Sequence, residues 1–427
     1  MYDILEFGAV ADGVTVNTEA IQTAIDTCSL NGGGKVVIPL GDFVTGTVYL
    51  KDNVEFYISS GATLIASTNR EDFNSDDAYP QNYGCAAEGW TGQHLIIAHE
   101  VKNVTVSGHG VIDGRGDYYF DLISPSQTGY GWRYGMRCVK DKQSLRPGQL
   151  ICFIECENVK VTDISIRNTT CWCLFLHGCE NVQVKGLEIY NNRSYLNADG
   201  IDVDCCKNAT VSDCVILTAD DGITVRCSSK KLKKYRACEN ITVSDCIIRA
   251  SACGMRFGVG EGEIKNVKVS GLTIADCGTA LLLQTRYGKF CHGRLQDIHI
   301  SDVLCKKSGR AFQITAPDVG FIKNVTLSNM NLKTYTGVFI GSTGDGEVSE
   351  ITLKDIKITI EKEGDEFVET PKSAEFKGTH PIRVNSTRNV TLDNVEVFKD
   401  EDVVGYDNGL IANEDNENLS IENCNFK

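Results

Sequence analysis

A short run of alternating apolar and polar residues recurs along most of the chain. Each copy reads Asn (or Asp or Glu), apolar, variable, apolar, and a small polar corner separates it from another apolar step. Most copies begin 23 to 32 residues after the previous one. Alternation with period two is typical of β-strands. The copies are NVTVSGHGVI (from 103), NVKVTDISI (158), NVQVKGLEI (181), NATVSDCVI (208), NITVSDCII (240), NVKVSGLTI (266), DIHISDVLC (297), NVTLSNMNL (324), EITLKDIKI (350), NVTLDNVEV (389) and NLSIENCNF (418).

This periodicity predicts an all-β fold, a single right-handed parallel β-helix of about ten or eleven rungs. The strands are short and β-branched, and Asn at matching corners suits stacked turns, because Asn tolerates left-handed backbone geometry. A β-propeller would show hairpin turns and a period near ~40–45 residues. We therefore expect one domain, 1–427, with regular rungs over 151–427.

The first part of the chain departs from the repeat. TEAIQTAIDTCSLNGG predicts an amphipathic helix with Thr18 as N-cap and Gly32 near its end. Such a helix would cover the open apolar end of the stack. A cover is needed there because an exposed sheet edge can pair with another chain. We assign this cap and the first strands to 1–67.

Two long irregular stretches, 68–100 and 113–149, interrupt the early rungs within 68–150. Long loops on a rigid scaffold usually shape a site. A third interruption, 361–380, is more charged, and we interpret it as a surface excursion.

Composition narrows the classes of function. The net charge of −15 argues against nucleic-acid binding and would repel an anionic polymer unless a local basic patch received it. Many of the 19 cysteines lie in apolar strand-like runs, and close pairs such as Cys205–Cys206 lack zinc-site partners. No export signal or stretch near the ~20 residues of a membrane span is visible. We expect a cytoplasmic protein without cofactor or metal.

An acidic step before two successive strands is the strongest candidate chemistry. In a parallel β-helix, equivalent residues of successive rungs lie ~4.8 Å apart. Aligning the inward apolar residues places one column before the strands: Trp172, Asp199, Asp221, Cys253 and Thr279. A second, outward column holds Phe175, Asp202, Thr224, Arg256 and Leu282. Asp220 lies beside Asp221, so four carboxyl groups are predicted to converge.

Convergent carboxyls disfavour joint ionisation, so at least one pKa should be raised. A protonated carboxyl beside an ionised one suits glycoside hydrolysis, which needs an acid for the leaving oxygen and a base for water. Two other interpretations remain open: ordinary Asp-Gly corners, and a structural Ca²⁺ site.

At these residues the chain resembles glycoside hydrolase family 28, the polygalacturonase-like enzymes. The resemblance runs from FGAVADG through GGGKVVIP, GVIDGRG and RPGQLICFIECENVKV to about residue 330. The family's Asn-Thr-Asp and Asp-Asp motifs correspond to Asn197-Ala198-Asp199 and Asp220-Asp221. The resemblance implies inverting hydrolysis, with Asp220 as general acid and Asp199 and Asp221 holding the attacking water.

Two family motifs are missing. Cys253 stands where the histidine of Gly-His-Gly is expected, and Leu282-Leu283-Gln284 replaces the Arg-Ile-Lys that grips a uronate. His109, in an early Gly-His-Gly, belongs to another rung. Losing Arg and Lys together removes the donors for a sugar carboxylate. The sequence therefore predicts a divergent member that is not a standard polygalacturonase.

Several residues are candidates for substrate contact. The candidates by register or resemblance are Asn197, Asp202, Arg256, Trp172, Gln284, Arg286, Tyr287 and Lys289. Arg256 could instead pair with Asp202. The weaker candidates are Trp90, Trp132, Tyr134, His177 and His292, and the basic run 230–236 is interpreted as a solvated loop.

The leading hypothesis is an exo-acting glycosidase on a non-polymeric plant-type oligosaccharide or glycoside. A calcium-dependent polysaccharide lyase on the same fold is an alternative, with Arg256 as base. A non-catalytic carbohydrate-binding β-helix is another, in which the aspartates do no chemistry. The sequence leaves the sugar and the oligomeric state undetermined.

Overall fold

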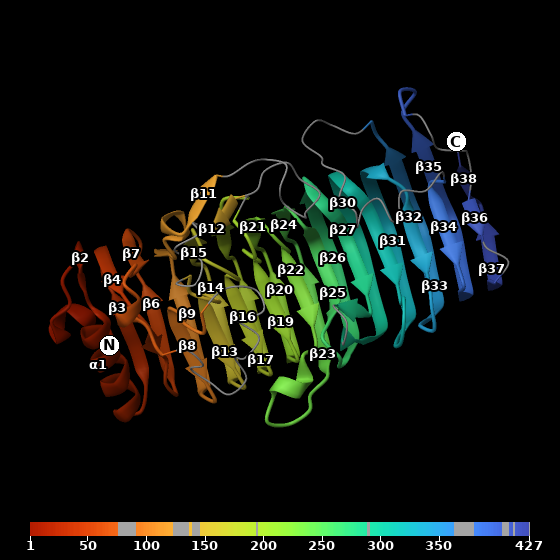
Figure 1. The fold of residues 1–427 in the computed structure, drawn as a ribbon. Coiled ribbons are helices and arrows are strands. Elements are labelled where there is room, and N and C mark those ends of the chain that lie inside the picture. Colours follow the sequence, from red (N-terminus) through yellow and green to blue (C-terminus); the bar gives the residue numbers. More distant parts are fainter. Residues whose placement is uncertain are drawn as a thin grey trace.

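The repeated strands stack into a parallel β-helix with three sheet faces (Figure 1). The structure, a computed structural model, describes residues 1–75, 91–122, 136–138, 146–193, 195–287, 291–362, 380–403, 410–412 and 415–426. Pairing is parallel between successive rungs, from β1 (Tyr2–Asp3) at one end to β37 (Glu417–Glu422) and β38 (Asn425–Phe426) at the other. The predicted fold class is confirmed.

The first face carries the candidate site. Its strands are β5 (Val48–Tyr49), β8 (Ile96–His99), β13 (Ile151–Ile154), β16 (Leu174–His177), β19 (Ile201–Asp204), β22 (Ile223–Arg226), β25 (Cys253–Val259), β27 (Cys277–Gln284), the end of β30 (Arg294–Thr315), β32 (Val338–Gly341), β34 (Ile382–Asn385) and β36 (Leu410–Ala412).

The second face contains the Asn-initiated runs. It comprises β1, β3 (Gly34–Ile38), β6 (Val54–Ile58), β9 (Lys102–Gly108), β14 (Glu157–Thr162), β17 (Glu180–Lys185), β20 (Lys207–Ser212), β23 (Cys238–Ser244), the first parts of β26 (Glu263–Ala275), β30, β31 (Phe321–Thr336), β33 (Glu347–Ile360) and β35 (Arg388–Lys399), and β37.

The third face follows a second corner. It comprises β2 (Asp12–Val16), β4 (Gly41–Thr45), β7 (Ala62–Ala66), β10 (Val111–Asp113), β15 (Ser165–Arg167), β18 (Glu188–Tyr190), β21 (Val215–Thr218), β24 (Ile247–Ala250), the later parts of β26, β30, β31, β33 and β35, and β38. Two short antiparallel pairs lie outside the faces: β11 (Phe120–Leu122) with β12 (Met136–Cys138), and β28 (Arg286–Tyr287) with β29 (Cys291–His292).

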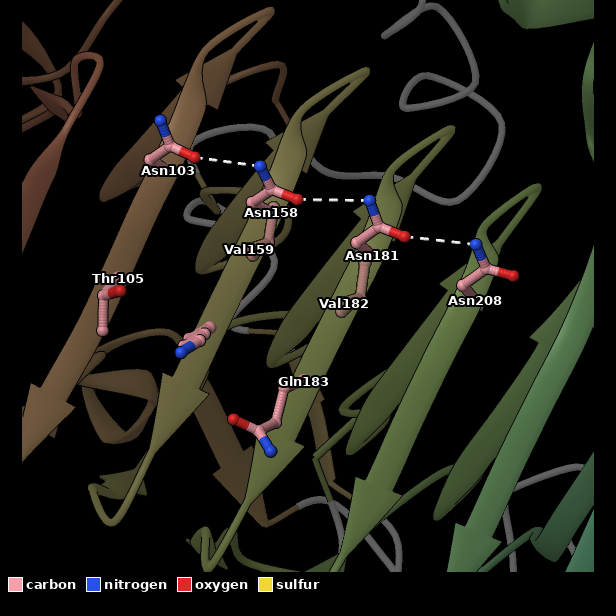
Figure 2. Close-up of a pocket in the computed structure, with 9 residues that line it drawn as sticks. Asn103, Thr105, Asn158, Val159, Asn181, Val182, Gln183 and Asn208 are labelled. Atoms are coloured by element: carbon pink, nitrogen blue, oxygen red, sulfur yellow. Dashed lines mark hydrogen bonds between the residues drawn. The ribbon is translucent and has the colours of Figure 1, made fainter.

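Asparagines at the start of the second-face strands form a ladder that fixes the register (Figure 2). Each side-chain amide donates to the one before it: Asn158 to Asn103 at 2.9 Å, Asn181 to Asn158 at 3.1 Å and Asn208 to Asn181 at 3.1 Å. These residues have φ near +55°, from 55° at Asn103 to 57° at Asn158, which Asn adopts more readily than most residues. The shallow groove in Figure 2 lies beside this ladder, on a different face from the candidate site.

The inward positions of the three faces build one continuous apolar core along the helix axis. The cysteines whose side chains the structure describes are free thiols, and all but Cys424 are buried. Since a thiol packs as a small hydrophobe, these cysteines fill the core.

Helix α1 (Thr18–Leu30) lies at the N-terminal end of the stack and buries Ile21, Ala24, Ile25 and Cys28 (Figure 1). The predicted N-cap was wrong by one residue, because Asn17 holds that position. The Thr18 hydroxyl is engaged elsewhere, since it accepts from Gly46 N at 2.7 Å. Asn17 makes no side-chain capping bond of its own, because its amide is bonded to Val10 and Val44 instead.

Candidate active site

Three aspartates converge on the first face, where the aligned register placed them. Asp199 directly precedes Gly200 and β19, and Asp220 and Asp221 precede β22 on the next rung. The backbone bond from Gly200 N to Asp221 O (2.9 Å) joins the two turns. One carboxylate oxygen from each aspartate lies within 4.8 Å of the others, and the three residues are 3–6% exposed. The local backbone therefore forces carboxyl groups together in a nearly dry site.

Asp221 is held from the following rung. Its Oδ1 accepts from Cys253 N at 3.0 Å, and its Oδ2 accepts from Arg256 Nη1 at 3.2 Å. The latter is also an ion pair, and its guanidinium side chain is 17% exposed. With both oxygens bonded, this carboxylate has a fixed orientation toward Asp199 and Asp220. Charge-assisted bonds of this kind are the stronger class of hydrogen bond.

Cys253 occupies the position where a histidine was expected. Burial, and next the negative charge of Asp221, raise the pKa of this thiol well above its ordinary value. The side chain therefore stays a neutral thiol beside the carboxylate. It cannot supply the positive charge that a protonated histidine would bring to the same place.

Arg226 and Asp204 extend the charged cluster along the same face. The Arg226 guanidinium bonds Asp202 Oδ1 at 3.3 Å and lies 3.3 Å from Asp204 Oδ2. Its Cζ stands 4.2 Å from the centre of the Trp172 ring, a cation–π contact. The alternative pairing of Arg256 with Asp202 is wrong, since Arg256 bonds Asp221 and Arg226 bonds Asp202.

Sequence reasoning missed Arg226 and Asp204, although a signal existed. Arg226 lies two residues after Thr224, and Asp204 lies two residues after Asp202, both of which are in the outward column. Because side chains alternate along a strand, Arg226 and Asp204 also point outward. The register pairs Asp204 with Arg226 directly across adjacent strands. Extending the alignment by one outward position would have found them.

Asp202 is the carboxyl whose environment is most altered. Burial raises its pKa from 3.8 to about 7, while Arg226 opposes the shift and the charges of Asp221 and Asp204 add to it. The side chain is fully buried. One carboxyl of the cluster thus has a raised pKa, as expected, but burial is the main cause and the neighbouring negative charges contribute less.

We expect Asp202→Asn to reduce the loss of stability between about pH 4 and pH 7. The folded protein keeps a proton on Asp202 that the unfolded chain, with a pKa near 3.8, has already released over this range. Since the folded state binds more protons, stability falls as pH rises through this window. Thermal unfolding midpoints across pH 4–8 measure the effect. Asp213→Asn, at an exposed corner, is the control, and equal slopes for wild type and Asp202→Asn would contradict it.

The other candidate contact residues are dispersed. Asn197 has φ 54° and its Oδ1 accepts from Arg146 Nη2 at 3.4 Å. Gln284, at the end of β27, pairs in register with Thr315, and Arg286 forms an exposed ion pair with Asp318 at 2.8 Å. Of these three, the structure links only Asn197 directly to the turn that carries Asp199.

Trp172 and His177 stand on the rung before Asp199. Trp172 is 8% exposed and packs edge-on against Phe175, whose ring also contacts His177. His177 is buried, and its Nε2 lies 3.4 Å from Ser228 O. Tyr287 and His292 lie on β28 and β29, and the structure does not describe their side chains. Trp90, Trp132, Tyr134 and Lys289 lie outside the described residues.

Among the residues that the structure describes, two groups of donor atoms are close enough to share a metal ion: the three aspartates, and His177 with Asp204 and Cys205. In the second group Arg226 already pairs with Asp204, and burial raises the pKa of the Cys205 thiol well above its ordinary value. These donors therefore suit a hydrogen-bonded cluster better than a cation site.

Within the described part of the chain, none of the helices has the length and apolar character that a bilayer crossing requires.

The chain is 23% identical over 344 residues to a probable polygalacturonase of Vitis vinifera, covering 79% of this chain and 61% of the relative. It is 28% identical over 252 residues to an exo-poly-alpha-D-galacturonosidase of Dickeya chrysanthemi, covering 52% of this chain and 41% of the relative. The chain thus spans less than two thirds of either relative's length.

Among solved structures, a family 28 exopolygalacturonase of Yersinia enterocolitica has the same fold. It superposes with a TM-score of 0.73 at 16% identity and covers 99% of this chain and 77% of that one. The sequence model of the glycosyl hydrolases family 28 matches residues 28–315. Because that match covers well over half of the chain, the protein belongs to family 28 of the glycosyl hydrolases.

Proposed function

We propose that the protein is an inverting glycoside hydrolase whose catalytic residues are Asp199, Asp220 and Asp221. The observation that carries the proposal is the meeting of three nearly buried carboxylates within 4.8 Å on adjacent rungs. In the proposed reaction, Asp220 gives its proton to the glycosidic oxygen. A water molecule held by Asp199 and Asp221 loses its proton to that pair and attacks the anomeric carbon.

The short separation of the carboxylates bears on where the water binds. Inverting enzymes typically hold acid and base ~6.5–9.5 Å apart so that water fits between them. Here the water would lie beside the Asp199–Asp221 pair instead. Asp221 suits this role, since Arg256 and the Cys253 amide fix both of its oxygens. Membership of the family supports the same assignment of roles.

We further propose exo action on a plant-type oligosaccharide or glycoside that is not polymeric galacturonan. The relatives named above act on galacturonan by their descriptions, but this chain has Leu282-Leu283-Gln284 in place of the expected cationic clamp. Both arginines of the cluster are already paired with carboxylates. A uronate placed against these two arginines would therefore meet cations that are already paired with carboxylates, which disfavours its binding there.

A calcium-dependent lyase is the second candidate, and Arg256 would be its base. The Arg256 guanidinium donates to Asp221, and such a pair favours the charged form of the arginine, which cannot accept a proton. This pairing disfavours the lyase.

The third alternative is a non-catalytic carbohydrate-binding β-helix. Such a protein would bind sugar without turnover.

The test is a substrate panel followed by product analysis. Purified protein is incubated with polygalacturonate, oligogalacturonides, neutral pectic oligosaccharides and aryl glycosides, with and without chelator. We expect hydrolysis of a neutral or modified glycoside, unaffected by chelator, and proton NMR of the first product to show the inverted anomer. A retained anomer, an unsaturated product or fastest turnover of polygalacturonate would each contradict part of the proposal.

A further inference from the structure

A fully buried arginine lies next to the acidic cluster without belonging to it. Arg146 is 1% exposed and is among the largest fully buried side chains. Its guanidinium donates to three acceptors: Thr170 O at 3.0 Å, Leu196 O at 2.9 Å and Asn197 Oδ1 at 3.4 Å. Burying a guanidinium costs free energy unless it is hydrogen-bonded. A buried arginine whose acceptors all come from neighbouring turns therefore suggests a role in holding those turns in place.

Those acceptors belong to the two turns that precede the active-site column. Thr170 lies two residues before Trp172, and Leu196 and Asn197 lie just before Asp199. Asn197 adopts φ 54°, a left-handed conformation that Asn tolerates and that turns the chain toward Asp199. One planar guanidinium therefore ties the turns of two successive rungs together at the place where the chain enters the site.

A second connection leads from the same turn to Asp220. The carbonyl of Ala198, between Asn197 and Asp199, accepts from Asp220 N at 3.2 Å and Ala219 N at 3.3 Å, and also from the Thr218 hydroxyl. The turn that Arg146 holds is thus the anchor for both Asp199 and Asp220. A shift of this turn would change the spacing of the two carboxyls.

Aromatic rings close the other side of the guanidinium. Arg146 Cζ lies 5.5 Å from the centre of the Phe120 ring, and Phe120 stacks on Tyr195 with centroids 4.4 Å apart. Phe120 and Tyr195 are each 5% exposed or less. A dry surrounding strengthens the bonds of Arg146, because water does not compete for the same carbonyls.

We propose that Arg146 is a positioning residue for the catalytic aspartates. It sets the Asn197–Asp199 turn and, through the Ala198 carbonyl, the start of the Asp220–Asp221 turn. Its described contacts are with the backbone and side chains of these turns and with Phe120. The expected effect on turnover rests on the proposed function. The expected effect on the positions of the carboxylates does not.

The experiment compares Arg146→Met and Arg146→Lys with Arg236→Met. Arg236 is a matched control, since its Nη1 also donates to a backbone carbonyl, Gly178 O, at 2.9 Å. This bond does not involve the turns that carry the aspartates. We expect Arg146→Met to lower kcat about 10–100-fold with KM changed less than about threefold, because misplacing reacting groups by about 1 Å is costly. Arg146→Lys keeps the charge but not the planar set of donors, so its kcat should fall in between.

Crystal structures of the variants provide a readout that does not depend on activity. We expect the Asp199 carboxylate in folded Arg146→Lys or Arg146→Met to move by roughly 1 Å or more relative to Asp221. Unmoved carboxylates, or a kcat unchanged in soluble folded protein, would overturn the inference. If wild type hydrolyses no glycoside, the proposed function fails, and the structures alone decide the role of Arg146.

Discussion

Asp220→Asn is expected to lower turnover at least about 100-fold, the lower range for loss of a general acid. The amide keeps the size of the side chain but has no proton to give the glycosidic oxygen. Asp220 is 6% exposed and its backbone amide is bonded to Ala198 O, so the variant should keep the turn and the neighbouring carboxylates in place. Steady-state rates on the best substrate from the panel give the measurement.

The control for this variant is Asp213→Asn. Asp213 stands at an outward corner with φ 57°, a conformation that Asn also tolerates, and pairs loosely with Lys185 at 3.8 Å. Its replacement should leave kcat unchanged. If Asp220→Asn retained more than about a tenth of wild-type turnover, Asp220 would not be the general acid.

Arg226→Met is expected to lower the free energy of unfolding by about 3–5 kcal/mol, the range for removing one partner of a buried ion pair. Methionine replaces much of the volume against Trp172 but leaves Asp202 and Asp204 without their cation. Both carboxyl groups are at most 1% exposed, so water cannot solvate them in place of the Arg226 guanidinium. Urea unfolding at pH 8, where Asp202 is mostly ionised, should reveal the largest difference.

Two comparisons separate this effect from ordinary loss of a surface charge. Arg167→Met removes an exposed partner of Asp113, at 3.1 Å, and should change stability by less than about 1 kcal/mol. In a background carrying Asp202→Asn and Asp204→Asn, Arg226→Met should cost much less than in wild type. Equal losses for Arg226→Met and Arg167→Met would show that the cluster does not depend on Arg226.

The two guanidiniums divide the acidic face into two paired groups. Arg256 serves Asp221 from the following rung, and Arg226 serves Asp202 and Asp204 on the Trp172 side. Asp199 and Asp220 belong with Asp221, since one carboxylate oxygen of each lies within 4.8 Å of the others. This division keeps several carboxyls within a few ångströms of one another without placing all of their charge on one side.

Much of the fold and the core of the site could be predicted from the sequence. Period-two alternation defined the strands, and Asn or Asp at the corners defined the rungs, because few residues accept positive φ there. Once rungs are stacked in parallel, neighbouring residues are fixed by counting. That is why Asp199 and Asp221 could be placed in one column, and why Arg256 could be placed beside Thr224.

Only the tertiary structure decided which charged groups pair. Register gives the row of each side chain but not its rotamer, and Arg256 reaches Asp221 and not Asp202, the partner that register offered as an alternative. Arg146 lies 51 residues from Asn197, in a segment without the repeat, so no periodicity could bring it to the turn. The sequence by itself determined the stack and the acidic column, since both follow from local backbone preferences. Burial and competition among long side chains chose the partners, and these depend on the whole assembled face.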